Sequence, residues 1–181
     1  DHGFYMGMIQ AYADTSTDIS QNEFAKPFHN LNRLDNLTVE SAGERTDIFS
    51  SVLGATIILP YPDWHPKLLW AYIKRNTQLA LQSFDYQIHK SAWSDVARSA
   101  NEHNDPGHFT TFIGYEFTTS TDIEGGNLHR NVIFNSSIAS IRPWTRIDSI
   151  NPEDLWTWQD KLRAKGVDTI SIPHNSNGSN G

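Results

Sequence analysis

The sequence predicts an α/β domain in which crossover helices join the strands of a parallel sheet. The chain has 181 residues, which is the size of one domain. Hydrophobic residues make up 38% of it and include six Trp, so a core can be packed and disorder is excluded over most of the length. In the second half, strand-like runs alternate with a helical pattern. Strand, helix and strand in that order are typical of a parallel sheet.

Helices are expected first, over residues 12–90. Apolar residues recur at helical spacing after Thr38, a good N-cap, and the pattern ends at Gly54. A second helix is expected to begin near residues 65–66, where a proline suits the first turn. A third is expected over 91–102, which carries its own apolar stripe.

Strands are expected from about residue 109. A turn pattern at 104–107 precedes an aromatic and β-branched strand over 109–117. A second strand is expected over 129–134. A helix over 151–165 follows, with an N-capping Asn and a Pro at its first position. A buried strand over 167–172 completes the alternation.

The composition excludes several classes of protein and of site. The net charge is −7 and the 14 Lys and Arg residues are scattered, so no basic stripe follows a nucleic-acid backbone. No run of about 18 apolar residues occurs, so we expect no membrane span. The chain has no cysteine, which excludes disulfides, thiolate nucleophiles and cysteine-held metals. The cytoplasm and the periplasm both stay open.

We expect the chain to be an internal fragment of a longer protein. It opens on Asp1 and His2 without a Met or a signal peptide, and it closes on an Asn, Ser and Gly run over 175–181. A mature domain with a processed N-terminus and a polar C-terminal tail is the alternative.

Four residues with metal-binding side chains lie next to predicted strands or at the opening of the chain. Glu116 ends one strand, His174 directly follows another, and His2 opens the chain. The C-terminal ends of parallel strands share one face, where functional side chains collect. His129 begins its strand, so it reaches that face only from the far end or on an antiparallel neighbour. Taken singly, each histidine is more typical of a hydrogen-bonded turn residue than of a metal ligand. Glu116 alone is equally an ordinary surface acid or a helix-capping partner.

Three imidazoles and one carboxylate that meet in space form a cation site. Mixed nitrogen and oxygen donors suit Zn, Mn, Fe or Ni better than Mg or Ca, which prefer oxygen. A carboxylate bridges two ions and an imidazole does not, so Glu116 is the natural shared ligand of a two-metal centre. Spacing alone leaves the metal-ligand and structural roles equally open.

Four short motifs, in this order, resemble the polymerase and histidinol phosphatase (PHP) superfamily of metal-dependent phosphoesterases. Asp1-His2 resembles the end of its first strand motif, and residues 112–116 (FIGYE) resemble its Gly-x-Glu motif. Residues 127–131 (NLHRN) resemble its next histidine-bearing strand, and residues 172–175 (IPHN) resemble its Pro-His motif. The combination is similar to a poorly characterised bacterial branch with some exported members, so an exported or periplasmic and a cytoplasmic location both stay open.

The resemblance implies part of a distorted (β/α)7, TIM-like barrel. It also implies two or three divalent ions, Zn, Mn or Fe, at the strand C-termini of the complete protein. The implied metal ligands are His2, Glu116, His129 and His174, with Glu116 bridging. Asp1 is implied as a weak ligand or as a residue that orients the ligands. Asn175 is expected to orient ligands or substrate, or only to form a turn.

The chain departs from the superfamily in two ways. The opening His-x-His and closing Asp-x-His motifs are absent, which agrees with a fragment whose incomplete site binds metal weakly. His2 and Glu116 lie much farther apart than in the superfamily, and the excess coincides with residues 12–90. We therefore expect one PHP-like domain over 1–181 with a helical insertion at about 12–90. We expect this insertion either to close over the metal site and select the substrate, or to serve packing or an oligomer contact.

The implied function is metal-dependent hydrolysis, most specifically of a phosphate ester on a small molecule, by hydroxide that the metals activate. Glu116 is the expected catalytic ligand. Arg130 is the expected phosphate clamp, because arginine grips a tetrahedral anion with two parallel hydrogen bonds. An ordinary surface arginine is the alternative interpretation of Arg130.

The alternative function is a non-catalytic, exported module with vestigial metal ligands. Such a module holds a carbohydrate or another small ligand on its aromatic residues. Trp156 and Trp158 lie two positions apart on a predicted helix, so both cannot face one ligand. We therefore expect these two residues to pack in and around the core.

Overall fold

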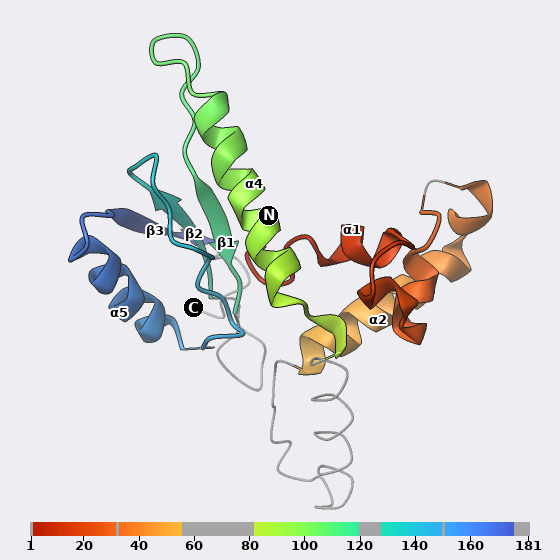
Figure 1. Cartoon of the computed structure of the whole chain (residues 1–181). Helices are drawn as coiled ribbons and strands as arrows, with labels where there is room; N and C mark the ends of the chain where they lie inside the picture. Colours follow the sequence, from red (N-terminus) through yellow and green to blue (C-terminus); the bar gives the residue numbers. More distant parts are fainter. Residues whose placement is uncertain (1, 32, 56–81, 120–127, 150, 176–181) are drawn as a thin grey trace, which may run out of the picture. The chain divides into compact units, whose positions relative to one another are not determined.

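The computed structural model describes five stretches of the chain (Figure 1). They are residues 2–31, 33–55, 82–119, 128–149 and 151–175. The chain divides into two units, which we call the sheet unit (residues 1–6 and 89–181) and the helical unit (residues 7–88). Of the helices described, none is both long enough and apolar enough to cross a membrane. The single domain with an insertion at about 12–90 stays a prediction.

The described part of the helical unit consists of one long helix, one short helix and three 3-10 turns. They are α1 (Met8–Ala13), the 3-10 turns η1 (Ile19–Gln21), η2 (Glu23–Phe28) and η3 (Leu34–Asn36), and α2 (Val39–Ala55). Thr38 caps α2, because its Oγ1 accepts a hydrogen bond from the backbone N–H of Ser41 at 3.2 Å. The predicted cap and helix are therefore confirmed. The helix expected near residues 65–66 lies outside the described residues.

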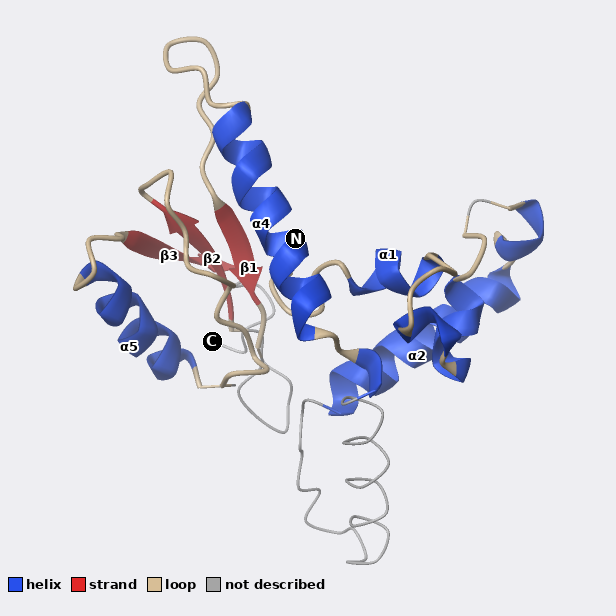
Figure 2. Cartoon of the chain, in the orientation of Figure 1, coloured by secondary structure: helices blue, strands red, loops and turns tan. Residues whose placement is uncertain are grey.

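In its described part, the sheet unit contains three strands, the helix α5 (Pro152–Arg163) and all but the first three residues of the helix α4 (Tyr86–Glu102). The strands are β1 (Gly114–Phe117), β2 (His129–Phe134) and β3 (Thr169–His174). Figure 2 shows these elements. The predicted strand over 129–134 and the helix over 151–165 are confirmed, and the side chain of Asn151 caps α5 through the N–H of Glu153. The helix predicted over 91–102 begins earlier, at Tyr86.

The sheet has the order β1-β2-β3, and both pairs are antiparallel. The predicted parallel arrangement of these strands is therefore wrong. Phe134 at the end of β2 pairs with Thr169 at the start of β3, so the connection between them leaves and returns at the same end of the sheet. Residues 135–149 and α5 connect the end of β2 to the start of β3 at the same end of the sheet. A connection between parallel strands must instead run from one end of the sheet to the other. The (β/α)7 barrel stays a prediction.

The two faces of the sheet carry different side chains. Tyr115, Phe117, Val132 and Phe134 are buried on one face, the helix-covered face, where they pack with Trp93 and Leu155 from α4 and α5. Strand alternation and register place the other residues on the opposite face. We call it the histidine face, and its members are Gly114, Glu116, His129, Asn131, Ile133, Ile170, Ile172 and His174.

Candidate metal centre

The antiparallel register brings the predicted metal ligands to one end of the histidine face. Glu116 lies near the C-terminal end of β1, and His129 begins the neighbouring β2. His129 pairs directly with His174, the last residue of β3. Of the two ways in which His129 was expected to reach this end, the antiparallel neighbour is the one observed.

The N-terminal segment lies along the edge of β1 that does not pair with β2, and it supplies His2 as the fourth residue of the cluster. His2 forms a parallel bridge with Glu116, and the N–H of Gly3 donates to the Glu116 carbonyl oxygen at 2.8 Å. Nε2–H of the buried His89 donates to the Gly3 carbonyl at 2.7 Å and fixes this segment from α4. A Cβ on Gly3 would lie 2.4 Å from Cδ2 of Tyr115, so only glycine permits the close approach.

The Glu116 carboxylate lies among the three imidazoles. Its Oε1 is 2.7 Å from Nδ1 of His129 and 3.4 Å from Nδ1 of His2. Its Oε2 is 3.8 Å from Nε2 of His174. The Glu116 side chain is 12% exposed, against 49% for His2 and 41% for His174. The two oxygens therefore face different imidazoles, which is the arrangement that a bridging carboxylate requires.

His129 is the most enclosed of the imidazoles. Burial lowers its pKa below the ordinary value for histidine, and the negative charge of Glu116 opposes this shift only in part. Its Nδ1 is buried and, despite the 2.7 Å separation from Oε1, makes no well-directed hydrogen bond within the described chain. A neutral imidazole beside a carboxylate offers two donors that are chemically suited to a divalent cation.

The donor set fits a divalent metal, but the rings are not positioned around a single ion. In the stretches that the structure describes, no group of three or more His, Cys, Asp or Glu side chains is arranged to hold a metal. Donors on neighbouring corners of a tetrahedral zinc shell lie about 3.4 Å apart, given bonds of about 2.1 Å. The 2.7 Å between Oε1 of Glu116 and Nδ1 of His129 is shorter than this, so these two atoms must move apart to bind one ion. The half-exposed rings of His2 and His174 must also turn toward it.

Arg130 and Asn175 do not join this cluster in the described structure. Arg130 pairs with Phe117 and so lies on the helix-covered side of the sheet, where its Nη1 donates to the His129 carbonyl at 3.0 Å. The register thus separates Arg130 from the Glu116 carboxylate. Asn175 follows His174 with a left-handed backbone, φ 55°, as a turn-forming residue does. Asp1 lies outside the described residues.

The tryptophans that the structure describes serve mainly in packing. Trp93 is buried, and Trp158 packs against the core and stacks on Trp144 with ring centres 6.2 Å apart. Trp156 is 47% exposed on the other side of α5. The expected packing against the core is therefore confirmed for Trp158 but not for Trp156.

Sequence reasoning missed Thr118 as a member of the cluster. Its Oγ1 lies 2.6 Å from Nδ1 of His2 and 3.5 Å from Oε1 of Glu116. The strand period of two, continued past Phe117, places residue 118 on the same side as residue 116, and this signal was sufficient to find it. A hydroxyl in this position orients the imidazole of His2.

Comparison with known proteins identifies a family. A family model described as "Protein of unknown function (DUF3604)" matches residues 1–181. Neither the curated proteins nor the solved structures gave a match. The matched range contains both units and all four residues of the histidine and glutamate cluster.

Proposed function

This chain belongs to the DUF3604 family of proteins of unknown function, and we propose from its own residues that it is a metal-dependent hydrolase, most specifically a phosphoesterase. One observation carries this proposal: His2, His129 and His174 surround a single, largely buried carboxylate, Glu116. A carboxylate with three imidazoles is costly to enclose without a cation, because enclosed charges are normally paired or bound to metal.

We assign different roles in ion binding to the residues of the cluster. Glu116 offers Oε1 on the side of His2 and His129 and Oε2 on the side of His174, so it serves as the shared ligand. The Thr118 hydroxyl accepts a hydrogen bond from Nδ1–H of His2 and leaves Nε2 for an ion. Divalent ions, when bound, lower the pKa of water and neutralise charge on phosphoryl oxygens, which favours hydrolysis of a phosphate ester.

The proposed function does not include Arg130. Its side chain lies on the opposite side of the sheet from Glu116, so it does not reach a substrate at the cluster. The phosphate-clamp role predicted for Arg130 is therefore not carried forward.

Metal titration of the chelator-treated chain tests the proposal. We expect weak binding of Zn or Mn by the wild type and a loss of at least about tenfold in affinity in Glu116→Gln, which keeps the shape of the side chain but removes its charge. Glu102→Gln, at the exposed end of α4, is the matched control and should bind like the wild type. Equal affinity in Glu116→Gln and the wild type would contradict the metal site.

Hydrolysis is tested separately with p-nitrophenyl phosphate. Turnover should require added Mn or Zn, disappear with EDTA and return when the metal is restored. Turnover that persists in EDTA would contradict metal dependence. Metal binding without turnover would support the metal site but contradict the proposed hydrolase activity.

A further inference from the structure

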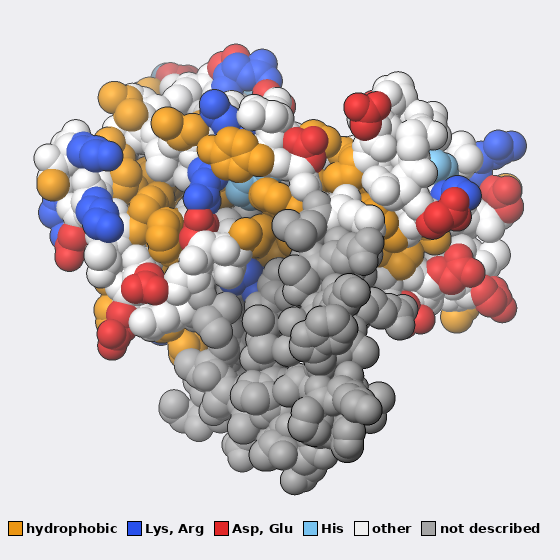
Figure 3. Space-filling view, turned by 60° about the horizontal axis from the view of Figure 1, so that its bottom comes forward, with side chains coloured by type: hydrophobic (Ala, Val, Ile, Leu, Met, Phe, Trp, Pro, Cys, Tyr) orange, Lys and Arg blue, Asp and Glu red, His pale blue; other side chains and the backbone are white. Residues whose placement is uncertain are grey.

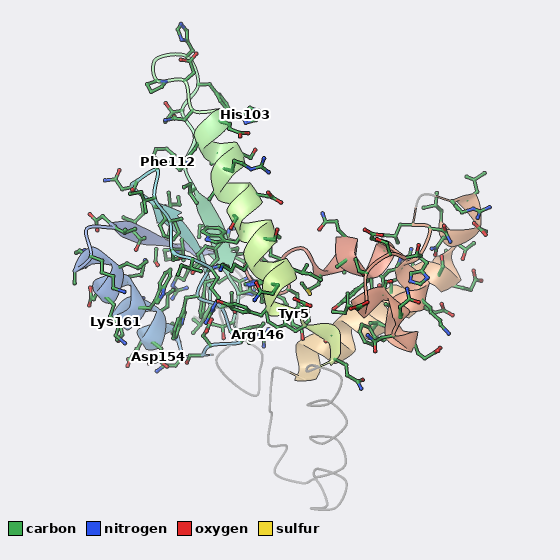
Figure 4. The ribbon with its side chains drawn as sticks, in the orientation of Figure 1. Tyr5, His103, Phe112, Arg146, Asp154 and Lys161 are labelled. Carbon is green, nitrogen blue, oxygen red and sulfur yellow. The ribbon has the colours of Figure 1, made fainter. Side chains whose placement is uncertain are left out.

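Arg146 is a buried arginine outside the cluster of histidines. It lies in the turn between β2 and α5 of the sheet unit (Figure 4). Only 5% of the residue is exposed. Burial lowers the pKa of its guanidinium from the ordinary value, but arginine keeps its charge in proteins. A full positive charge is therefore enclosed in this turn.

The guanidinium of Arg146 has no ionic partner in the described part of the chain. It makes no ion pair or hydrogen bond there, and its Nε is completely buried. The nearest acid in the sequence, Asp148, binds Arg142 through both carboxylate oxygens. Oδ2 of Asp148 also accepts from the backbone N–H of Thr145 at 2.9 Å. Asp148 is thus occupied by other groups, and Arg146 is left unpaired.

The aromatic contact of Arg146 offsets little of this charge. Its Cζ lies 5.7 Å from the centre of the Phe4 ring, which is a cation–π contact. Such a contact is weak beside the desolvation of a full charge, so buried arginines are normally paired with an acid or with a bound anion. The described part of the chain supplies no acid here, so an external anion would be a suitable partner for this guanidinium.

We propose that Arg146 anchors a binding site for a small oxyanion, namely the phosphate or carboxylate group of a ligand, with Phe4 as one wall. The planar guanidinium presents parallel N–H donors that match the two oxygens of either group. The site rests on Arg146 itself and does not require a metal ion at Glu116.

The turn that carries Arg146 is fixed without any ligand. The backbone N–H groups of Asp148 and Ser149 both donate to the Thr145 carbonyl, at 2.9 Å and 3.2 Å. The ion pair between Arg142 and Asp148 closes the turn from the other side. Because the turn is already ordered, binding of an oxyanion requires little loss of conformational entropy.

The oxyanion site lies next to the candidate metal centre. The Phe4 ring that contacts Arg146 also lies 5.8 Å, centre to centre, from the His2 imidazole. A small ligand held by its anionic group at Arg146 is therefore separated from the cluster by one aromatic ring.

Thermal unfolding with and without anions tests the proposal. All samples contain a chelator, and NaCl keeps the ionic strength constant. The Tm of the wild type should rise with inorganic phosphate or with acetate, because a ligand that binds only the folded state stabilises it. Arg146→Met should lose this rise. Its Tm without anion should exceed that of the wild type, because an unpaired buried charge has been removed.

Arg142→Met is the matched control, because Arg142 is a nearby arginine with a partner. Its Tm should fall, since Asp148 then loses its ion pair, but its Tm should still rise with the anion. Arg146→Lys keeps the charge without the planar fork and should bind about tenfold more weakly than the wild type. A rise with phosphate alone assigns the site to phosphate, and a rise with acetate alone assigns it to a carboxylate.

Three outcomes would overturn the oxyanion site. One is a wild type that responds to neither anion, and another is an anion response that survives in Arg146→Met. The third is an Arg146→Met chain less stable than the wild type in anion-free buffer, because the guanidinium would then have a partner within the protein. Since these measurements contain chelator and the Glu116→Gln titration contains no phosphate, each proposal can fail alone.

Discussion

The two faces of the three-stranded sheet differ in what their side chains do. On the helix-covered face, Tyr115, Phe117, Val132 and Phe134 are at most 4% exposed and pack in one hydrophobic core. On the histidine face, a polar cluster occupies one end, while Ile170 and Ile172 remain 56% and 44% exposed. In the sequence, residues of the two faces simply alternate.

The comparison shows that one short sheet carries its core residues on one face and its candidate metal ligands on the other. A core residue such as Phe117 follows directly after Glu116, yet the two side chains point to opposite sides. Substitutions on the helix-covered face should therefore change the free energy of unfolding, and substitutions on the histidine face should change binding. On the molecular surface drawn in Figure 3, the Lys and Arg side chains are scattered among the described residues.

The largest expected effect is the truncation of a core side chain on the helix-covered face. Phe117 is fully buried, so Phe117→Ala should reduce the free energy of unfolding by about 3–5 kcal/mol. Ile170→Ala on the histidine face is the control, and it should change stability by less than about 0.5 kcal/mol because Ile170 is exposed. Urea unfolding followed by Trp fluorescence measures both. A similar loss in the two variants would show that the histidine face is also covered in solution.

A smaller effect is expected where the two faces depend on each other, at Gly3. A Cβ at this position would lie 2.4 Å from the Tyr115 ring, so Gly3→Ala must displace either the core ring or the segment that carries His2. We expect a loss of about 1–3 kcal/mol in the free energy of unfolding and a weaker affinity for Zn or Mn.

Gly43→Ala is the matched control for Gly3→Ala. Gly43 lies within α2 and nothing approaches its Cβ position within 4 Å, so this change should stabilise the chain by roughly 0.5–1 kcal/mol. Metal affinity should not change, because Gly43 is in the helical unit. If Gly3→Ala left both stability and metal affinity at wild-type values, the close contact with Tyr115 would be refuted.

Local signals in the sequence predicted most elements of the fold, but not how the strands pair. Thr38 and Asn151 each precede a helical pattern, and both cap a helix as expected. The direction of β3 was predicted wrongly. A strand–helix–strand sequence has the same local pattern whether the two strands end up parallel or antiparallel. That choice depends on the path of residues 135–149, which carry no periodic signal.

The candidate site was predictable in its members, because acids and imidazoles at strand ends are visible in the sequence. The proximity of His129 to His174 depends on antiparallel pairing, and that is a tertiary property. Arg130 seemed close because it follows His129, but a neighbour in a strand points to the other face. The unpaired state of Arg146 was not predictable, since it depends on Asp148 binding to Arg142 instead.

The smallest expected effect concerns pH and His89, which reaches from α4 to the segment that carries His2. Its side chain is buried, and burial lowers its pKa below the ordinary value of 6.5, with the hydrogen bond to Gly3 opposing in part. The unfolded chain therefore binds a proton below about pH 6.5 that the folded chain does not bind. This stabilising contribution is complete above that pH and is lost as the pH falls, by at most about 1.4 kcal/mol per pH unit.

His89→Gln keeps an N–H donor for the Gly3 carbonyl but does not titrate. The free energy of unfolding of this variant should therefore fall less steeply between pH 7 and pH 5, as estimated from urea unfolding, than that of the wild type. A shallow slope remains, because burial also lowers the pKa of His129. His103→Gln, at an exposed position just after α4, should keep the wild-type slope because His89 is intact. A wild-type slope in His89→Gln would show that His89 accepts a proton as readily in the folded chain as in the unfolded one.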